Sequence, residues 1–486
     1  MTEFLRKKTH GFKRGISFGF FYVKLVNSNI LKMKKQLFIV FILSLFASNT
    51  QAQLAGSFCG THSFSEVWEN EIQRLILETK NLQKNKNQTE NNYVIPVVFH
   101  VIHGGESVGT FPNILEGQIQ SQMTILNQDF SGNAYNASNY PPNAFVNWAV
   151  NQNIPGLNLD LNGRIKIADF NIQFCLATKD TSGQLLPEPG IHRVNYLSLG
   201  IPNPSTYTTQ STMKAYLDNT LKPQTIWDVR KYLNVWITDK NTALTYSGVS
   251  SGPPFSGLMD LPNNATELTD GIWCYTKVVG SNALFPPGSY LSPMIDGRTL
   301  THEAGHYVGL RHIWGDQDCG NDFCNDTPPA AGQNSGAPTY PHEAGSCASP
   351  SNNPDGEMFM NFMDYTRGPS VYMFTTDQRT RAQTAMLNSP FRNQLGTHGL
   401  CSETTDLIKT NLKNALSVYP NPAKKHLNLD VSETEPKEIL IIDLFGQVLI
   451  ATKNTHVVDI SCLAQGMYFV TVSTGQQTYA QTFIKE

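Results

Sequence analysis

The strongest constraint on this chain lies in one short segment, THEAGHYVGLRH at residues 301–312. His302 and His306 are four residues apart, so on a helix both imidazoles leave the same face and can bind one metal ion. Gly309 can adopt a positive φ, which lets the helix end there and lets the chain turn back. That turn would return His312 as a third ligand. The segment therefore predicts a metal site built on a helix and the turn that follows it.

Glu303 indicates what kind of metal site this is. Three neutral nitrogens leave the fourth position of a Zn²⁺ ion open for water. A zinc ion lowers the pKa of its bound water towards about 7, and the carboxylate of Glu303 can then take the proton. A structural zinc site would not need this residue. We therefore expect hydrolytic chemistry, and we keep two alternatives: a surface adhesin with a structural zinc, and a zinc amidase acting on cell-wall peptides.

Composition and charge exclude two broad classes of protein. The 486 residues carry a net charge of only −3, whereas a dedicated nucleic-acid binder would show a basic domain. The mean hydropathy of −0.28 excludes a protein with many membrane spans. We therefore expect no nucleic-acid partner.

The amino-terminal region has the pattern of an export signal. Two lysines at 34 and 35 precede an apolar run at 37–47, and small residues lead to Ala52. This order is typical of a secretory signal peptide, and the run is short for a transmembrane helix. We assign residues 33–52 to the signal peptide and 1–32 to an extension from a misplaced start codon. The mature chain should have no membrane span, and most of its eight cysteines should pair in an oxidising compartment.

The middle of the chain alternates between strand and helix patterns. A β-branched run at 93–102 predicts a buried strand, and further strands are expected at 171–176 and 232–237. Apolar residues recur at helical spacing between 119 and 130. This alternation predicts an α/β catalytic domain over residues 93–405.

Several stretches resemble the pappalysin family of metzincin zinc proteases, in its bacterial cytophagalysin branch. The HExxHxxGxxH pattern at 302–312 is the metzincin zinc signature. Other matches are IPVVFHVIH at 95–103, LNQDF at 126–130, YLNVW at 232–236, LRHIWGD at 310–316, DTP at 326–328 and NFMDY at 361–365. The resemblance implies a twisted mixed sheet with the zinc helix above a cleft and an irregular lower half. It also implies a Met-turn at Met363 and an oxyanion-stabilising tyrosine at Tyr365. An enzyme of this family would act on protein or peptide substrates.

The resemblance extends to two further features. Cys59 lies in FCGT at 58–61, and family zymogens carry a Cys-Gly-Thr segment whose thiolate occupies the open zinc position. We therefore expect residues 53–92 to form a propeptide with a cysteine switch, although a disulfide remains an alternative for Cys59. The family also has calcium after the zinc helix, and Asp326 and Thr327 match it best, in a loop that could equally be a solvated acidic segment.

The chain departs from the family in the loop after Tyr365. This loop lacks the cysteine that many members have, so the disulfide pairing of the family cannot be transferred whole. It also lacks the acidic residue of arginine-specific members and instead contains the basic Arg367. The resemblance therefore does not extend to a preference for arginine at the cleavage site.

The carboxyl-terminal region predicts a separate small domain. After a polar linker at 406–414, five short strands separated by turn signals predict a β-sandwich over 415–486. YPNP at 419–422, the Asp443–Gly446 turn and GMY at 466–468 resemble the type IX secretion sorting domain. The resemblance implies handling by the type IX secretion machinery and a place outside a gram-negative cell. An accessory binding module is the alternative.

Overall fold

The structure is a computed structural model, and it describes residues 59–61, 64–85, 92–152, 157–254, 265–347, 353–401, 416–431, 438–442, 448–473 and 478–486. The expected extension (1–32), signal peptide (33–52) and linker (406–414) lie outside these residues. Within them, the chain forms no helix with the length and apolar character that crossing a membrane requires.

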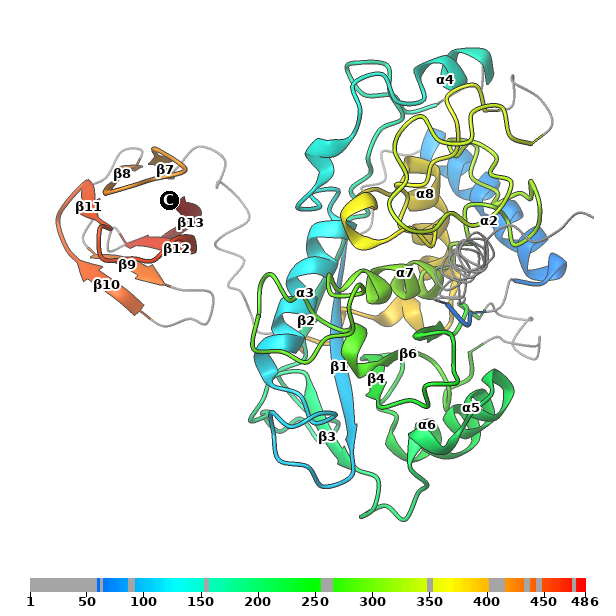
Figure 1. Cartoon of the computed structure of the whole chain (residues 1–486), viewed down its shortest axis with the longest axis horizontal. Coiled ribbons are helices and arrows are strands. Elements are labelled where there is room, and N and C mark those ends of the chain that lie inside the picture. Colours follow the sequence, from blue (N-terminus) through cyan, green and yellow to red (C-terminus); the bar gives the residue numbers. More distant parts are fainter. Residues whose placement is uncertain are drawn as a thin grey trace, which may run out of the picture. The chain divides into compact units, whose positions relative to one another are not determined.

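A six-stranded mixed sheet forms the centre of the larger part of the chain (Figure 1). Its strands are, from one edge to the other, β2 (Ile172–Leu176), β1 (Tyr93–His103), β4 (Leu233–Thr238), β6 (Ile272–Tyr275) and β5 (Gly248–Ser250), with β3 (Ile191–Asn195) also paired to β1. All pairings are parallel except that of β5 with β6. The β-branched side chains of β1 are almost all buried, as a parallel strand covered on both faces requires. The predicted α/β class with a mixed sheet is confirmed.

Two helices connect the sheet to the predicted site. α3 (Glu116–Phe130) packs against β2 and against α7 (Arg298–Tyr307), and α7 also contacts β5 and β6. Apolar residues on the inner face of α3 are buried, as their helical spacing predicts. The remaining helices of this part are α2 (Glu66–Asn85), α4 (Val146–Gln152), α5 (Gln210–Tyr216), α6 (Lys222–Thr225) and α8 (Thr376–Asn388).

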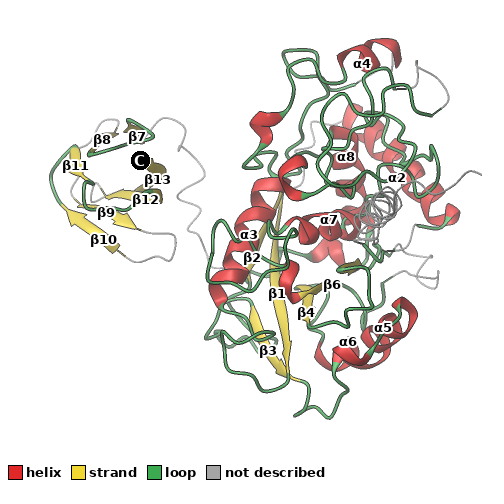
Figure 2. Ribbon diagram, viewed as in Figure 1, coloured by secondary structure: helices red, strands yellow, loops and turns green. Residues whose placement is uncertain are grey.

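Long loops and α8 form most of the region after α7 (Figure 2). Two disulfides, Cys175–Cys401 and Cys319–Cys347, fasten this region. The expectation that most of the eight cysteines pair is wrong, because only these four do. Cys274 and Cys324 are buried without a disulfide, where a thiol packs as a small apolar group.

The carboxyl-terminal domain is a small β-sandwich with a core of its own. One sheet has the order β10-β9-β12-β13 and the other β11-β8-β7. The strands are β7 (Leu416–Tyr419), β8 (His426–Val431), β9 (Glu438–Ile442), β10 (Val448–Thr452), β11 (Val457–Asp459), β12 (Gly466–Ser473) and β13 (Thr478–Lys485). The sandwich is confirmed, but the expected five strands are too few. The prediction lacked β7 and β10, and β10 buries no side chain fully and so lacks a clear alternation.

Candidate metal centre

Helix α7 carries three of the predicted site residues, and it ends where the sequence indicates. His302, Glu303 and His306 are all buried on this helix. Gly309 has φ +98°, and the main-chain N–H of the next residue, Leu310, donates back to the carbonyl of Gly305 over 2.9 Å. This left-handed turn returns the chain towards the helix.

The turn brings His312 to the two histidines of the helix. The Nε2 atom of His306 lies 3.2 Å from Nε2 of His302 and 3.1 Å from Nε2 of His312. Ligands at the usual zinc–nitrogen distance of about 2.0–2.1 Å in a tetrahedral site would be separated by roughly 3.3 Å. The three rings are therefore spaced as they would be around one zinc ion.

Hydrogen bonds orient the three rings through their outer nitrogens. Nδ1 of His302 donates to the main-chain oxygen of Phe362 (2.7 Å), and Nδ1 of His306 donates to that of Leu310 (2.9 Å). Nδ1 of His312 donates to the carboxylate of Asp316. These partners leave the Nε2 lone pairs directed to the common centre. Burial, followed by the nearby His312, lowers the pKa of His302 to about 3, and the same causes lower the pKa of His306. Neutral imidazoles are the form that binds a metal.

Cys59 is the fourth member of the cluster. Its sulfur and the three histidine nitrogens all lie within 4.8 Å of one another. In the part of the chain that the structure describes, this is the one place where three or more such ligand groups converge. Cys59 is not in a disulfide, so the expected alternative role as a disulfide partner is not observed.

The residues after Cys59 occupy the edge of the central sheet. The N–H of Gly60 donates to the carbonyl of Gly248 on β5 over 2.8 Å. The hydroxyl of Thr61 donates to Oε2 of Glu303 over 2.7 Å and accepts the N–H of Ser250 over 2.8 Å. Burial raises the pKa of Glu303 to about 8, although the hydrogen bond from Thr61 opposes this rise. The amino-terminal segment thus contacts both the ligand cluster and the predicted base.

Met363 packs against helix α7, and Tyr365 lies beside the histidines. A Cβ at Gly305 on α7 would collide with the sulfur of Met363, so a glycine there lets this buried side chain pack against the helix. The ring of Tyr365 is 5.0 Å from that of His312, and its hydroxyl is 3.5 Å from the carbonyl oxygen of Cys59. Met363 therefore forms an apolar support, while the tyrosine hydroxyl faces the segment that contains Cys59.

Two sequence families match this chain. Residues 216–387 match the Peptidase_M43 family, described as pregnancy-associated plasma protein-A, and this range includes the three histidines, Glu303 and Tyr365. Residues 417–486 match the secretion system C-terminal sorting domain. Residues 216–387 therefore resemble a peptidase domain of the pappalysin family.

Individual proteins are similar over parts of the chain. An extracellular metalloprotease of Colletotrichum graminicola is 33% identical over 136 residues, which are 27% of this chain and 45% of the relative. One of Neurospora crassa is 40% identical over 128 residues, or 26% of this chain and 41% of the relative. The chain spans about half the length of the curated relatives it matches. A solved structure of a promirolysin mutant from Tannerella forsythia is 28% identical with a TM-score of 0.50, covering 70% of this chain and 97% of that one.

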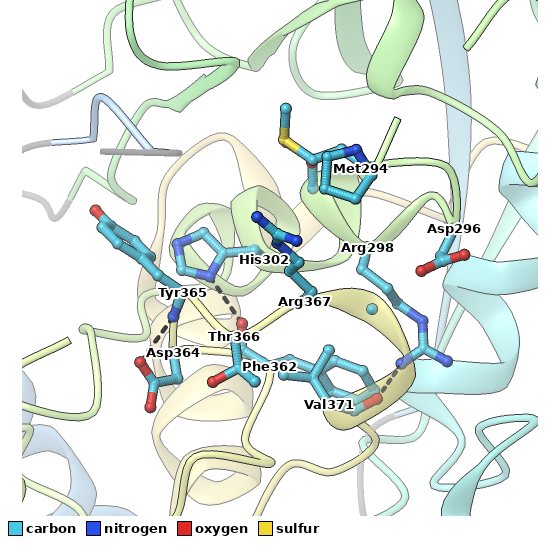
Figure 3. A pocket seen from close by; sticks show the side chains of 13 residues that line it. Met294, Asp296, Arg298, His302, Phe362, Asp364, Tyr365, Thr366, Arg367 and Val371 are labelled. Atoms are coloured by element: carbon cyan, nitrogen blue, oxygen red, sulfur yellow. Dashed lines mark hydrogen bonds between the residues drawn. The ribbon is translucent and has the colours of Figure 1, made fainter. Parts of the chain in front are cut away.

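An open pocket adjoins the histidine cluster (Figure 3). His302 and Tyr365 line it on the side of the cluster, and Asp296 and Arg367 also line it. Asp296, which lies in the segment before α7, supplies an acidic side chain to this pocket. The pocket carries side chains of both charges beside the metal centre.

The predicted calcium residues lie apart from this cluster. Asp326 accepts hydrogen bonds from the hydroxyl of Thr375 (2.6 Å) and the N–H of Asp377 (2.8 Å), so it binds the start of α8. The hydroxyl of Thr327 donates to Asp322 over 2.8 Å. Both predicted residues are buried and have partners within the protein.

Sequence reasoning missed a buried network that fixes α7. Asp129 on α3 accepts a hydrogen bond from Thr301 (2.6 Å) and pairs with Arg298 at 3.2 Å. Arg298 also donates to the carbonyl of Val371 over 2.6 Å. Asp129 lies in the LNQDF stretch that resembles the family. An acidic residue on the buried face of a predicted helix was the signal that could have indicated a buried partner for it.

Proposed function

We propose that this protein is a secreted zinc-dependent endopeptidase, made as a latent precursor, that hydrolyses peptide bonds in proteins. The observation that carries the proposal is the convergence of three oriented histidines beside a buried glutamate. The extracellular metalloproteases among its relatives support the same activity.

The residues at the centre fit zinc better than other biological metals. Three imidazole nitrogens and one thiol sulfur form the donor set, and zinc prefers nitrogen and sulfur ligands at tetrahedral spacing. We propose His302, His306 and His312 as the ligands that remain in the active enzyme. Bound zinc would supply Lewis acidity, which acidifies an attacking water and polarises the substrate carbonyl.

The protein side chains would handle the proton and the developing negative charge. Glu303 would accept the proton of the attacking water and pass it to the departing amine. The hydroxyl of Tyr365 would donate a hydrogen bond to the oxyanion. Met363 would support the ligand helix from below without taking part in the reaction.

The amino-terminal segment would keep the precursor inactive. A thiolate is a strong zinc ligand, so Cys59 would exclude the attacking water. Thr61 would at the same time occupy the carboxylate of Glu303. We propose residues 53–92 as the propeptide and 93–405 as the catalytic domain, so that removal of the first activates the second.

The carboxyl-terminal sandwich would serve as an export address. The match to a secretion system sorting domain supports recognition of residues 415–486 by the type IX secretion machinery of a gram-negative cell. A passenger protein fused to this domain should then reach the outside of such a cell. A passenger that stays in the periplasm would count against this role.

Calcium binding near Asp326 and Thr327 stays a proposal with its own test. Burial, followed by the charge of Asp377, raises the pKa of Asp326 to about 7. A cation held by main-chain oxygens and this carboxylate would favour its ionised form. Calcium added to zinc-loaded protein should raise the melting temperature, and an Asp326→Asn variant should lose that increase.

The central experiment measures proteolysis by purified, processed protein. Activity on a protein substrate should disappear with a chelator, return with zinc, and be absent from the Glu303→Ala variant, which should still bind zinc. Equal cleavage in all samples would reject the mechanism. Zinc binding without any cleavage would favour the adhesin, and cleavage confined to cell-wall peptides would favour the amidase.

A further inference from the structure

Helix α2 buries a carboxylate at a distance in sequence from the metal centre. Glu69 is only 2% exposed, and both of its oxygens accept hydrogen bonds from the guanidinium of Arg381 on α8. Arg381 is itself 1% exposed, and its Nε donates to the carbonyl of Gly309 over 2.7 Å. Arg311 adds a second positive charge, 3.8 Å from Glu69. The same arginine thus contacts α2 and the turn that returns His312.

An aromatic and aliphatic contact surrounds this ion pair. Trp68 is fully buried, its Nε1 donates to the carbonyl of Pro253 over 2.8 Å, and its ring centre is 5.2 Å from the guanidinium of Arg381. Ile72 and Ile76 pack with Ala385 of α8 in the same small core. Figure 1 shows α2 alongside α8. The sequence predicted a removable propeptide here, yet one face of α2 is packed like a core element.

These contacts do not depend on the metal. Each joins α2 to protein groups on or near α8, whereas Cys59 alone provides the metal-facing sulfur. Removing one partner of a buried ion pair leaves the other charge buried and uncompensated, which is strongly unfavourable. Detachment of α2 would impose this cost on Arg381 and would expose Trp68.

We propose that α2 is a second latch, and that the surface around Arg381 is a receptor for it. Cutting the chain between α2 and β1 would not release the segment, which would stay bound as an inhibitor in trans until it is itself degraded. The inhibitory part of this inference rests on the proposed latency, but binding does not require catalysis. The partner that the surface fits is an amphipathic helix with adjacent tryptophan and glutamate.

The test uses the full chain with Glu303→Gln and a specific protease site inserted between residues 85 and 92. After cutting, the fragment should co-elute with the rest of the chain in gel filtration, with or without a chelator. The fragment is then washed away in mild denaturant, and labelled synthetic peptides of residues 57–85 are added back. Their dissociation constants are measured by fluorescence anisotropy in chelator. Because the variants lie only on the peptide, the folding of the larger part is the same in every sample.

The Glu69→Gln peptide should bind at least about 30-fold more weakly than the wild-type peptide. The Cys59→Ser peptide should bind in chelator as well as the wild-type peptide. The matched control is Glu71→Gln, which changes a glutamate that is 28% exposed and pairs with Arg74 of the same helix. It should alter binding by less than about 2-fold. Equal binding of the Glu69→Gln and Glu71→Gln peptides, or no binding of the wild-type peptide in chelator, would overturn the proposal. The binding measurements do not require proteolytic activity. A failure of the proposed activity would therefore leave these results unchanged, and the two proposals can be rejected separately.

Discussion

The hydroxyl of Thr61 donates a hydrogen bond to Oε2 of Glu303 over 2.7 Å. The hydroxyl oxygen of Thr61 also accepts a hydrogen bond from the N–H of Ser250 on the edge strand β5. A single side chain therefore links the candidate general base to the sheet edge, two residues after the cysteine that faces the histidines. If latency works as proposed, the segment blocks the base as well as the metal.

Replacing Thr61 with valine should weaken latency while leaving Cys59 in place. The change keeps the side-chain shape but removes a hydrogen bond to a carboxylate, which is worth about 1.5–3 kcal/mol. The precursor should therefore convert to the processed form roughly ten-fold faster or more, as followed by gel electrophoresis over time. Thr61→Ser keeps the hydroxyl and should convert at close to the wild-type rate. Identical rates for Thr61→Val and the wild type would show that this hydrogen bond has no part in latency.

Gly309→Ala should impair both stability and zinc affinity. The residue has φ +98°, and a Cβ there would lie 2.9 Å from the Cβ of Ala385. Backbone strain of about 1–3 kcal/mol would combine with displacement of the turn that carries His312. Competition with a zinc-binding dye should show weaker binding, and chemical unfolding should show lower stability.

The matched control for this variant is Gly163→Ala. Gly163 also has a positive φ, of +76°, but a Cβ there meets nothing within 4 Å. It should lose stability through backbone strain alone and keep its zinc affinity. If both variants bind zinc like the wild type, the turn at Gly309 does not position the third ligand.

The metal cluster could be predicted from the sequence because its geometry is local. A helix fixes the relation of His302 to His306, and one glycine is enough to return His312 six residues later. Alternation and helical spacing likewise indicated β1 and α3, since each depends only on neighbouring residues. The positions of Met363 and Tyr365 came from a family resemblance, not from any local rule.

Contacts between distant segments could not be predicted in this way. Glu69 and Arg381 are 312 residues apart, and neither has a sequence context that identifies the other. The same holds for Asp129 and Thr301, which are 172 residues apart. Such pairs form only after the sheet and the long loops bring their elements together. The prediction that most cysteines pair failed for a similar reason, because disulfide formation depends on which thiols the fold places close together.

Tyr365→Phe should reduce turnover without loss of substrate affinity. The variant keeps the ring that packs near His312 but lacks the hydroxyl proposed to stabilise the oxyanion. Loss of one such donor costs about 10²–10³-fold in kcat in proteases of known mechanism. Steady-state kinetics on a peptide should therefore show a lower kcat with little change in KM. An unchanged kcat would assign Tyr365 to packing alone.

His100 sits in a buried network that favours its neutral form. Its Nε2 donates to Oδ1 of Asn234 over 2.8 Å, an oxygen that also accepts the N–H of Trp227. Its Nδ1 lies 2.9 Å from Nδ1 of His192, so one of these two nitrogens must remain unprotonated. Burial, followed by the effect of His192, lowers the pKa of His100 to about 3.

This lowered pKa predicts a loss of stability in acid. Below a pH of about 6.5 the unfolded chain binds a proton at His100 that the folded chain excludes, so the free energy of unfolding should fall by about 1.4 kcal/mol for each pH unit. The loss should continue until the pH approaches the folded-state pKa of about 3. Urea unfolding of the wild type and His100→Gln between pH 7.5 and 5 measures this slope, which should be shallower in the variant whatever its absolute stability. His398→Gln, which replaces an exposed histidine, should keep the wild-type slope. Equal slopes for all three proteins would mean that protonation of His100 does not limit the acid stability of the fold.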